Sequence, residues 1–332
     1  MSEDPDQHEQ SRLFTTDDGE FDESRAKEDT LPVEDGEVIN TDELADHQTY
    51  IEGRGIYDER NPINDLTGKE WKFATKSVLD KQYPPDFQHE LRGQHGGQKP
   101  PRLCADIIQR FTQAGDVILD PFAGVGGTLF GASLCEYEGS GFREAIGFEI
   151  NDEWIEVYEE VLEAENADRA AAGKGKLQSQ DIRHGDCEEL ITELENSSVD
   201  FLLTDVPYWS MDKVEQTRNV NKTRESKLGG FNTNSLQTKD EWLDDMQTKF
   251  EKFKPVIKED GYIAVFIGDM YREQSYNFLS ADLARSIQEV GLTLKANLIW
   301  YDPSKDLHVY GYPFSYIPSM VHQNILIFRK EN

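Results

Sequence analysis

Two segments that follow apolar runs carry the residues best suited to chemistry. The first segment is Asp120-Pro121-Phe122-Ala123-Gly124-Val125-Gly126-Gly127-Thr128, which comes directly after Val117-Ile118-Leu119. Glycines lack a Cβ and tolerate positive φ, so their backbone can approach a ligand closely. A helix is expected over 129–134, and the N–H groups at its start would have no intrahelical partners. This segment predicts a nucleotide-sized pocket at the end of a buried strand.

The second segment is Asp205-Val206-Pro207-Tyr208-Trp209, which follows the apolar run over 199–204. The carboxylate of Asp205 and the backbone carbonyl of Pro207 are hydrogen-bond acceptors, and the ring of Tyr208 can stack on a planar group. The side chain of Val206 brings no polar group. An acid, a carbonyl and an aromatic ring at one strand end favour binding of a planar ring that bears an amino group.

Both segments resemble motifs of one family, the S-adenosylmethionine (SAM) dependent amino-methyltransferases that act on N4 of cytosine or N6 of adenine in DNA. The segment from Asp120 resembles the SAM-binding motif, and the segment from Asp205 resembles the catalytic motif, from which Val206 departs. The resemblance covers roughly residues 68–330. It includes a Trp-ending strand near Trp300 and a closing strand after His322, where Gln323 replaces the usual Glu.

The resemblance implies a role for each residue. The target base would be flipped out of the DNA and stack on Tyr208, while Asp205 and the Pro207 carbonyl accept the two N–H bonds of its amino group. Lys99 and Pro100 lie in a Gln-Lys-Pro string before a helix that closes over the methionine end of SAM in the family. The other expected cofactor-binding residues are Asp120, Pro121, Phe122, Gly124, Gly126, Thr128, Glu149 for the ribose hydroxyls, and Asp186 with Cys187 for the adenine.

Strand-like and helix-like runs alternate from residue 117 onward, which favours a mostly parallel sheet with helices on both faces. With the resemblance, the predicted fold is α/β: a Rossmann-like methyltransferase fold whose seven-stranded sheet ends in an antiparallel C-terminal strand. We expect an acidic, disordered tail over 1–48 and a single methyltransferase domain over 49–330. Within that domain, 49–115 forms an N-terminal segment with the lid helix, and 210–237 forms an inserted basic loop.

Composition and net charge restrict the cellular compartment and the binding partners that we expect. Three scattered cysteines have no metal-ligand spacing, so we expect a reducing cytoplasm and no metal. No apolar run is long enough to cross a membrane. The formal net charge of −31 conflicts with binding to DNA phosphates. A salt-adapted surface or a partner other than bare nucleic acid would explain it, and the basic 210–237 segment leaves room for a local DNA contact.

Several alternatives stay open. A tRNA guanine-N2 methyltransferase shares both motifs, and a catalytically impaired SAM-binding regulatory protein would fit Val206, Gln323 and the acidity. A dehydrogenase-like nucleotide binder is disfavoured by Pro121-Phe122 in the glycine turn. Asp205 favours adenine, whereas the Tyr-Trp ending favours cytosine. Target recognition is expected from 210–237, 303–320 and the N-terminal segment, or from a partner subunit.

Overall fold

The structure, a computed structural model, describes residues 44–331 apart from 86, 94, 138–140, 210–237, 273 and 304. The expected tail up to residue 43 and the basic 210–237 loop therefore lie outside the described residues. Contacts within the chain define two compact units, and the expected domain bounds stay a prediction. The first unit comprises Met1–Asn61 and Leu66–Ala74, and the second comprises Pro62–Asp65 and Thr75–Asn332.

The first unit contains a hairpin and a short helix. Strands β1 (Gln48–Ile51) and β2 (Gly55–Asp58) pair antiparallel, and α3 spans Gly68–Ala74. The guanidinium of Arg54 donates two hydrogen bonds to the carboxylate of Glu70, at 2.8 and 2.9 Å. This paired, planar contact ties the hairpin to the helix within the unit.

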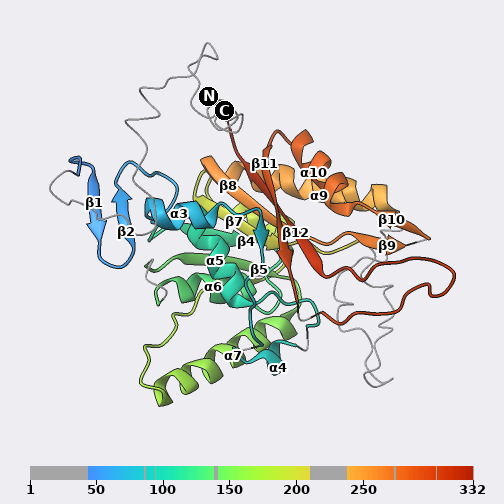
Figure 1. Ribbon diagram of the computed structural model, residues 1–332, viewed down its shortest axis with the longest axis horizontal. Helices are drawn as coiled ribbons and strands as arrows, with labels where there is room; N and C mark the ends of the chain where they lie inside the picture. The colour runs from blue at the N-terminus through green and yellow to red at the C-terminus, as the bar shows by residue number, and fades with distance from the viewer. Residues whose placement is uncertain are drawn as a thin grey trace, which may run out of the picture. The chain divides into compact units, whose positions relative to one another are not determined.

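The second unit is built on an eight-stranded sheet with the strand order β3-β11-β12-β8-β7-β4-β5-β6 (Figure 1). Five adjacent strands, from β8 to β6 in that order, run parallel, whereas β12 is antiparallel to both β8 and β11. The strands are β3 (Val78–Leu79), β4 (Val117–Asp120), β5 (Glu144–Glu149), β6 (Asp181–His184), β7 (Val199–Asp205), β8 (Ile257–Ile267), β11 (Thr293–Tyr301) and β12 (His322–Arg329).

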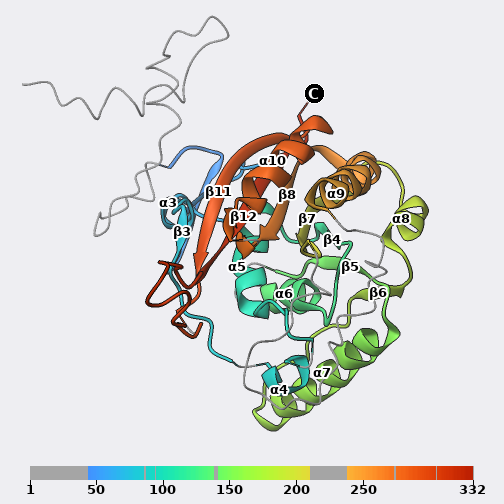
Figure 2. The same ribbon diagram turned by 90° about the vertical axis from the view of Figure 1, so that its right-hand side faces the viewer.

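Helices cover both faces of this sheet, as Figure 2 shows for α5 and α6 on one side and α9 and α10 on the other. A small hairpin of β9 (Met270–Arg272) and β10 (Ser275–Asn277) follows β8. The helices are α4 (His89–Arg92), α5 (Pro101–Phe111), α6 (Gly127–Cys135), α7 (Asp152–Ala171), α8 (Cys187–Leu190), α9 (Lys239–Phe253) and α10 (Leu279–Glu289).

The two faces form separate cores because successive side chains of a strand point to opposite sides. In β7, Phe201 and Leu203 pack with α5, α6 and α7, whereas Leu202 packs with α9 and α10. A strand buried on both faces has no polar side to alternate with. This explains why the central strands are short, continuous apolar runs in the sequence.

The predicted α/β fold is confirmed, including the antiparallel pairing of the last two strands. The sheet has eight strands rather than the predicted seven, because the two-residue strand β3 pairs with β11 at one edge. A capping box of Thr238 and Glu241 begins α9, the helix ends at Phe253, and Ile257 begins β8.

Candidate active site

The two segments with chemical potential meet at the centre of the sheet. Strands β4 and β7 are parallel neighbours, and the order of the strands reverses between them. Ligands of such sheets bind beyond the carboxyl ends of the strands at this reversal point. The Thr204 hydroxyl, next to Asp205, donates a 2.6 Å hydrogen bond to Oδ1 of Asp120. The two strand ends are thus joined directly.

A cavity of about 540 Å³ opens at these strand ends. Its size falls within the range of about 300–1,000 Å³ that small-molecule sites occupy. Six of the predicted cofactor-binding residues line it: Lys99, Asp120, Phe122, Gly124, Thr128 and Glu149. The three predicted catalytic residues, Asp205, Pro207 and Tyr208, line the same cavity. One space is therefore available to a methyl donor and to an acceptor.

The glycines of the first segment have different tasks. Gly124 lines the cavity with φ of 52°. Gly126 has φ of 75°, and a Cβ placed there would lie 2.3 Å from Cδ2 of Tyr158 in α7. Gly126 therefore does not line the cavity, and the reason for glycine at this position is close packing against a buried ring. The cofactor contact expected of Gly126 stays a prediction.

Glu149 ends β5 with a fixed carboxylate. Its Oε2 accepts from the backbone N–H of Gly124 and its Oε1 from that of Asn151, each at 2.8 Å. Burial raises the pKa of this carboxyl, while these hydrogen bonds act against the rise. Each oxygen keeps further acceptor capacity. The carboxylate is thus oriented at the cavity wall and is able to accept hydrogen bonds from ligand hydroxyls.

Asp120 is an almost completely buried acid at the end of β4. Burial raises the pKa of its carboxyl to about 6, although hydrogen bonds from Thr128, Thr204 and the N–H of Phe122 oppose the rise. Its Oδ1 accepts from both Thr204 and the Phe122 backbone. Asp120 thus fixes the turn between the strand and the glycines.

Asp205 is paired with Lys99 across the cavity. Nζ of Lys99 donates to Oδ2 of Asp205, and the two side chains are 9% and 21% exposed. The other carboxylate oxygen, Oδ1, is buried and accepts no hydrogen bond from the described part of the chain. Burial raises the pKa of the Asp205 carboxyl, whereas Lys99 lowers it. One oxygen is anchored and the other remains available to a donor in the cavity.

Pro207 and Tyr208 are held by residues from distant strands and helices. The Pro207 carbonyl accepts a 2.8 Å hydrogen bond from the indole N–H of Trp242 in α9, which leaves one lone pair. The Tyr208 hydroxyl accepts a 2.7 Å bond from Nε2 of Gln323 in β12. Gln323 replaces a Glu of the family pattern, and here it holds the tyrosine ring at the cavity wall.

The remaining predicted site residues do not line this cavity. Pro100 and Pro121 flank residues that do, and Gly126 packs on Tyr158. Oδ1 of Asp186 accepts a 2.8 Å hydrogen bond from the N–H of Glu188 and caps α8. Cys187 is buried, and burial raises the pKa of its thiol to about 12. The adenine-binding role of Asp186 and Cys187 stays a prediction.

Sequence reasoning missed His95, which lines the cavity and covers Gly124. A Cβ at Gly124 would lie 3.1 Å from Nε2 of His95, and the imidazole packs edge-on to Trp154 at 5.0 Å between ring centroids. Burial, Lys99 and Arg92 lower the pKa of His95 to about 4, so the ring is neutral at pH 7. Its position four residues before Lys99 was the only hint in the sequence.

The expected lid helix, α5, packs into the core with Leu103, Ile107 and Ile108 fully buried. Residues before the helix, including Gln98 and Lys99, line the cavity in its place. A Cβ at Gly131 of α6 would lie 2.7 Å from Cβ of Cys104, so the two helices approach closely. Position 99 is therefore set by a rigid helix pair.

The charge of the cavity wall is negative. Five acids, Asp120, Glu149, Asp205, Asp302 and Asp306, face it with two lysines, Lys99 and Lys305. Such a wall favours a cationic ligand over a pyrophosphate, which argues against the dinucleotide alternative.

Among the residues that the structure describes, no group of three or more His, Cys, Asp or Glu side chains could hold a metal ion. In the same part of the chain, no helix has the length and apolarity to span a membrane.

The fold and site define an α/β protein with a nucleotide-type cavity between a glycine turn and an Asp-x-Pro-Tyr strand end. The chain belongs to the DNA methylase family (N6_N4_Mtase), which it matches over residues 12–160 and 199–332. It is 30% identical over 128 residues to the type II methyltransferase M.HpaI of Haemophilus parainfluenzae, covering 39% of this chain and 34% of that protein. It is 34% identical over 110 residues to M2.DpnII of Streptococcus pneumoniae, covering 33% and 36%.

These matches span about a third of the length of either curated relative. Among solved structures, TrmN of Thermus thermophilus aligns with a TM-score of 0.41 at 12% identity, over 72% of this chain and 52% of that one. A SAM-dependent methyltransferase of Methanosarcina mazei aligns at 0.40 and 15%, over 68% and 97%.

Proposed function

We propose that this protein transfers a methyl group from SAM to the exocyclic amine of adenine or cytosine in DNA. The observation that carries the proposal is the shared cavity. Asp205 presents a buried, unoccupied carboxylate oxygen in the space that Glu149 and the Gly124 turn also line. Membership in the DNA methylase family supports DNA as the substrate.

The residues present fit SAM. The carboxylate of Glu149 would hold the ribose hydroxyls, and the backbone at Gly124 would lie against the ligand without a Cβ between them. The negative wall suits a sulfonium cation. When bound, SAM supplies an electrophilic methyl group. The type II methyltransferases M.HpaI and M2.DpnII, which this chain resembles in part, are consistent with that donor chemistry.

The protein's own groups act on the amine. The lone pair of the exocyclic amine nitrogen is delocalised into the base ring, so this nitrogen is a poor nucleophile. Oδ1 of Asp205 accepts one N–H, and the remaining lone pair of the Pro207 carbonyl accepts the other, which draws nitrogen toward tetrahedral geometry. Tyr208, fixed by Gln323, stacks on the flipped base. Oδ1 would also accept the proton that the nitrogen loses after transfer.

Lys99 is a positioning residue in this scheme. Its ammonium group fixes Oδ2 and stabilises the ionised form of Asp205 against the cost of burial. It therefore serves the catalytic carboxylate in addition to its predicted place beside the cofactor.

The three cysteines, all free and buried, suit a reducing cytoplasm. Target recognition would come from the 303–320 loop, 210–237 and the N-terminal segment, or from a partner subunit.

The test compares Asp205→Ala with Asp306→Asn, a change of another acid that lines the cavity. Asp205→Ala is expected to reduce transfer to DNA by at least about 10³-fold, the scale of losing a transition-state contact and a proton acceptor. SAM binding, measured by calorimetry, should stay within about twofold of the unchanged protein. Equal loss of binding and transfer would remove Asp205 from its role.

The product identifies the acceptor. The protein is expressed in a methylation-free host, and the genomic DNA is read by single-molecule sequencing for N6-methyladenine and N4-methylcytosine. Total RNA from the same cells is analysed for N2-methylguanine. Methylated RNA with unmethylated DNA would favour the tRNA alternative. SAM binding without either product would favour a regulatory protein.

A further inference from the structure

The connection between β11 and β12 differs from the rest of this acidic chain. Residues 307–321 contain no Asp, Glu, Lys or Arg, although such residues make up 30% of the protein. This stretch, which we name the aromatic arm, instead contains four Tyr or Phe rings: Tyr310, Tyr312, Phe314 and Tyr316. A surface segment of this length without charge needs a physical reason in so acidic a protein.

The arm exposes its apolar side chains instead of burying them. Tyr312 is 79% exposed, and Phe314 and Tyr316 are each 93% exposed. Leu307 and Val309 are 78% and 80% exposed. Single exposed apolar residues are common on surfaces, but a contiguous group of this kind marks a binding surface.

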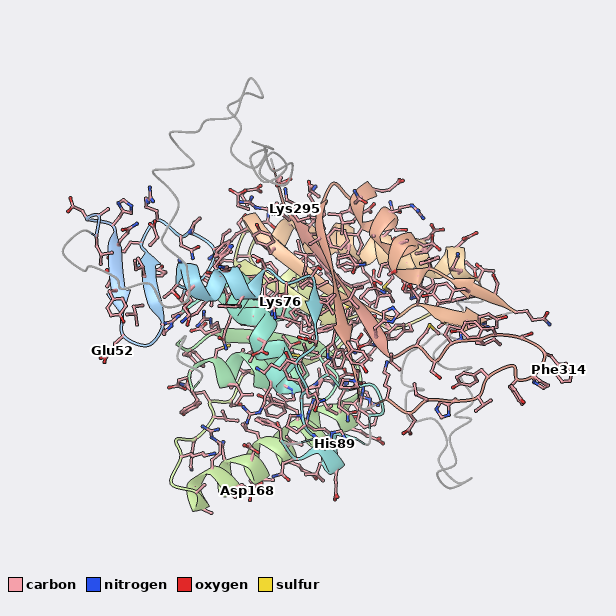
Figure 3. All side chains as sticks on the ribbon, in the orientation of Figure 1. Glu52, Lys76, His89, Asp168, Lys295 and Phe314 are labelled. Atoms are coloured by element: carbon pink, nitrogen blue, oxygen red, sulfur yellow. The ribbon has the colours of Figure 1, made fainter. Side chains whose placement is uncertain are left out.

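The arm is a folded element with internal contacts. The N–H of His308 donates to Oγ of Ser319 at 2.9 Å, and Tyr310 forms an antiparallel bridge with Ile317. The two limbs of the arm therefore lie against each other, and the rings project from the turn between them. Phe314 lies at the outer end and points away from the sheet (Figure 3).

Both ends of the arm reach the proposed active site. Just before it, Asp302, Lys305 and Asp306 line the cavity. Just after it, Gln323 donates to the Tyr208 hydroxyl. The aromatic arm is thus continuous with the rim of the cavity that would receive the target base.

We propose that the aromatic arm is a wedge that inserts its rings between base pairs of duplex DNA beside the target base. This inference rests on the proposed function. A base inside a duplex is out of reach of a cavity, so it must be extruded at the cost of its stacking and pairing. Apolar side chains that enter the gap left by the extruded base recover part of that cost, as the inserted side chains of DNA-kinking proteins do.

Charge favours DNA as the occupant. The protein carries a net charge of −31, so most of its surface repels phosphate. The arm itself lacks carboxylates and reaches outward from Asp302 and Asp306, which precede it, so its own side chains add no like-charge repulsion toward a polyanion. Stacking on bases also depends little on salt, unlike contacts to phosphates. A partner protein is the competing occupant, and the experiments below separate the two.

The first experiment measures methylation of one sequence in two forms, circular single-stranded phage DNA and its duplex replicative form, both from a methylation-free host. The double variant Phe314→Ala/Tyr316→Ala should lower the ratio of duplex to single-strand methylation about tenfold relative to the unchanged protein. The control Phe278→Ala, at a 61% exposed ring just before α10, should match the unchanged protein on both forms. Equal loss on both forms, or no loss on the duplex, would overturn the wedge.

The second experiment is binding of a fluorescein-labelled duplex, followed by anisotropy across a salt series. The double variant should bind about tenfold more weakly with the same slope of log K against log salt, because no charge has been removed. Unchanged affinity would assign the arm to a protein partner and overturn the proposal. The binding data test the role of the aromatic arm in DNA binding even if the unchanged protein methylates neither form of the DNA. Such an absence of methylation would contradict only the proposed function.

Discussion

The ammonium group of Lys99 donates to Oδ2 of Asp205, so a residue ahead of α5 holds the acid at the end of β7. The contact leaves Oδ1 without a hydrogen bond within the described chain. A carboxylate that is anchored by one oxygen and open at the other is suited to accept from an incoming amine. The pair therefore links the orientation of the acid to its ionisation.

Replacing Lys99 by Met is expected to shift the pH dependence of methylation. Burial raises the pKa of the Asp205 carboxyl, and Lys99 opposes this rise most strongly, ahead of Lys305 and Tyr208, so loss of the lysine lets the pKa rise further. Since the scheme requires the carboxylate, the acidic limb of kcat/KM should move to higher pH. Lys99→Arg keeps the positive charge and should restore much of the original profile. An unchanged acidic limb in Lys99→Met would contradict this role.

The Tyr208–Gln323 hydrogen bond is expected to act on the base and not on the cofactor. Gln323→Leu leaves a half-buried hydroxyl without its donor, which should raise KM for DNA about three- to tenfold with little change in SAM affinity. Tyr208→Phe removes the hydroxyl but keeps the ring. The double variant should lose no more than Tyr208→Phe alone, because removing the hydroxyl also removes the contact that Gln323 makes with it. Additive losses would show that the two residues act separately.

Asp120→Asn is expected to stabilise the protein at neutral pH. A folded-state pKa of about 6 means that the charged carboxylate is disfavoured by burial. The stabilising contribution of a raised acid is complete below its unfolded pKa and is lost as pH rises through about 6. At pH 7.5 the amide, which keeps an acceptor for Thr204 and the Phe122 N–H, should add about 1–3 kcal/mol to the free energy of unfolding.

The same variant provides its own control through pH. The gain should shrink as pH falls through about 6 and vanish below about pH 3, where the carboxyl is neutral in both the folded and the unfolded chain. Urea unfolding at several pH values measures it. A gain that does not depend on pH would show that the effect has another cause.

Local patterns predicted the strand ends well because each is encoded within a few residues. An apolar run, an acid and a glycine turn are enough to predict the end of β4. Strand β3 could not be predicted, because a two-residue strand has no periodicity and depends on pairing with β11.

Contacts between distant residues could not be predicted either. Lys99 and Asp205 are separated by 106 positions, and Tyr208 and Gln323 by 115. Each residue belonged to a recognised motif, but nothing local specifies its partner. The role of Gly126 was also hidden, since a glycine that packs on a ring and one that faces a ligand are identical in sequence. Only the fold separates Gly124 at the cavity from Gly126 at Tyr158.

Gly126→Ala compared with Gly173→Ala tests that packing role. Both glycines have positive φ, 75° and 69°, so both substitutions carry the backbone penalty of an L-residue in the left-handed region, about 1 kcal/mol. They differ in space, because a Cβ at 126 would lie 2.3 Å from the Tyr158 ring, whereas nothing lies within 4 Å at 173. Gly126→Ala should therefore lower the free energy of unfolding by about 2 kcal/mol more than Gly173→Ala. Denaturant midpoints measure the difference. Equal losses in the free energy of unfolding would show that the Tyr158 ring moves aside without a loss of stability.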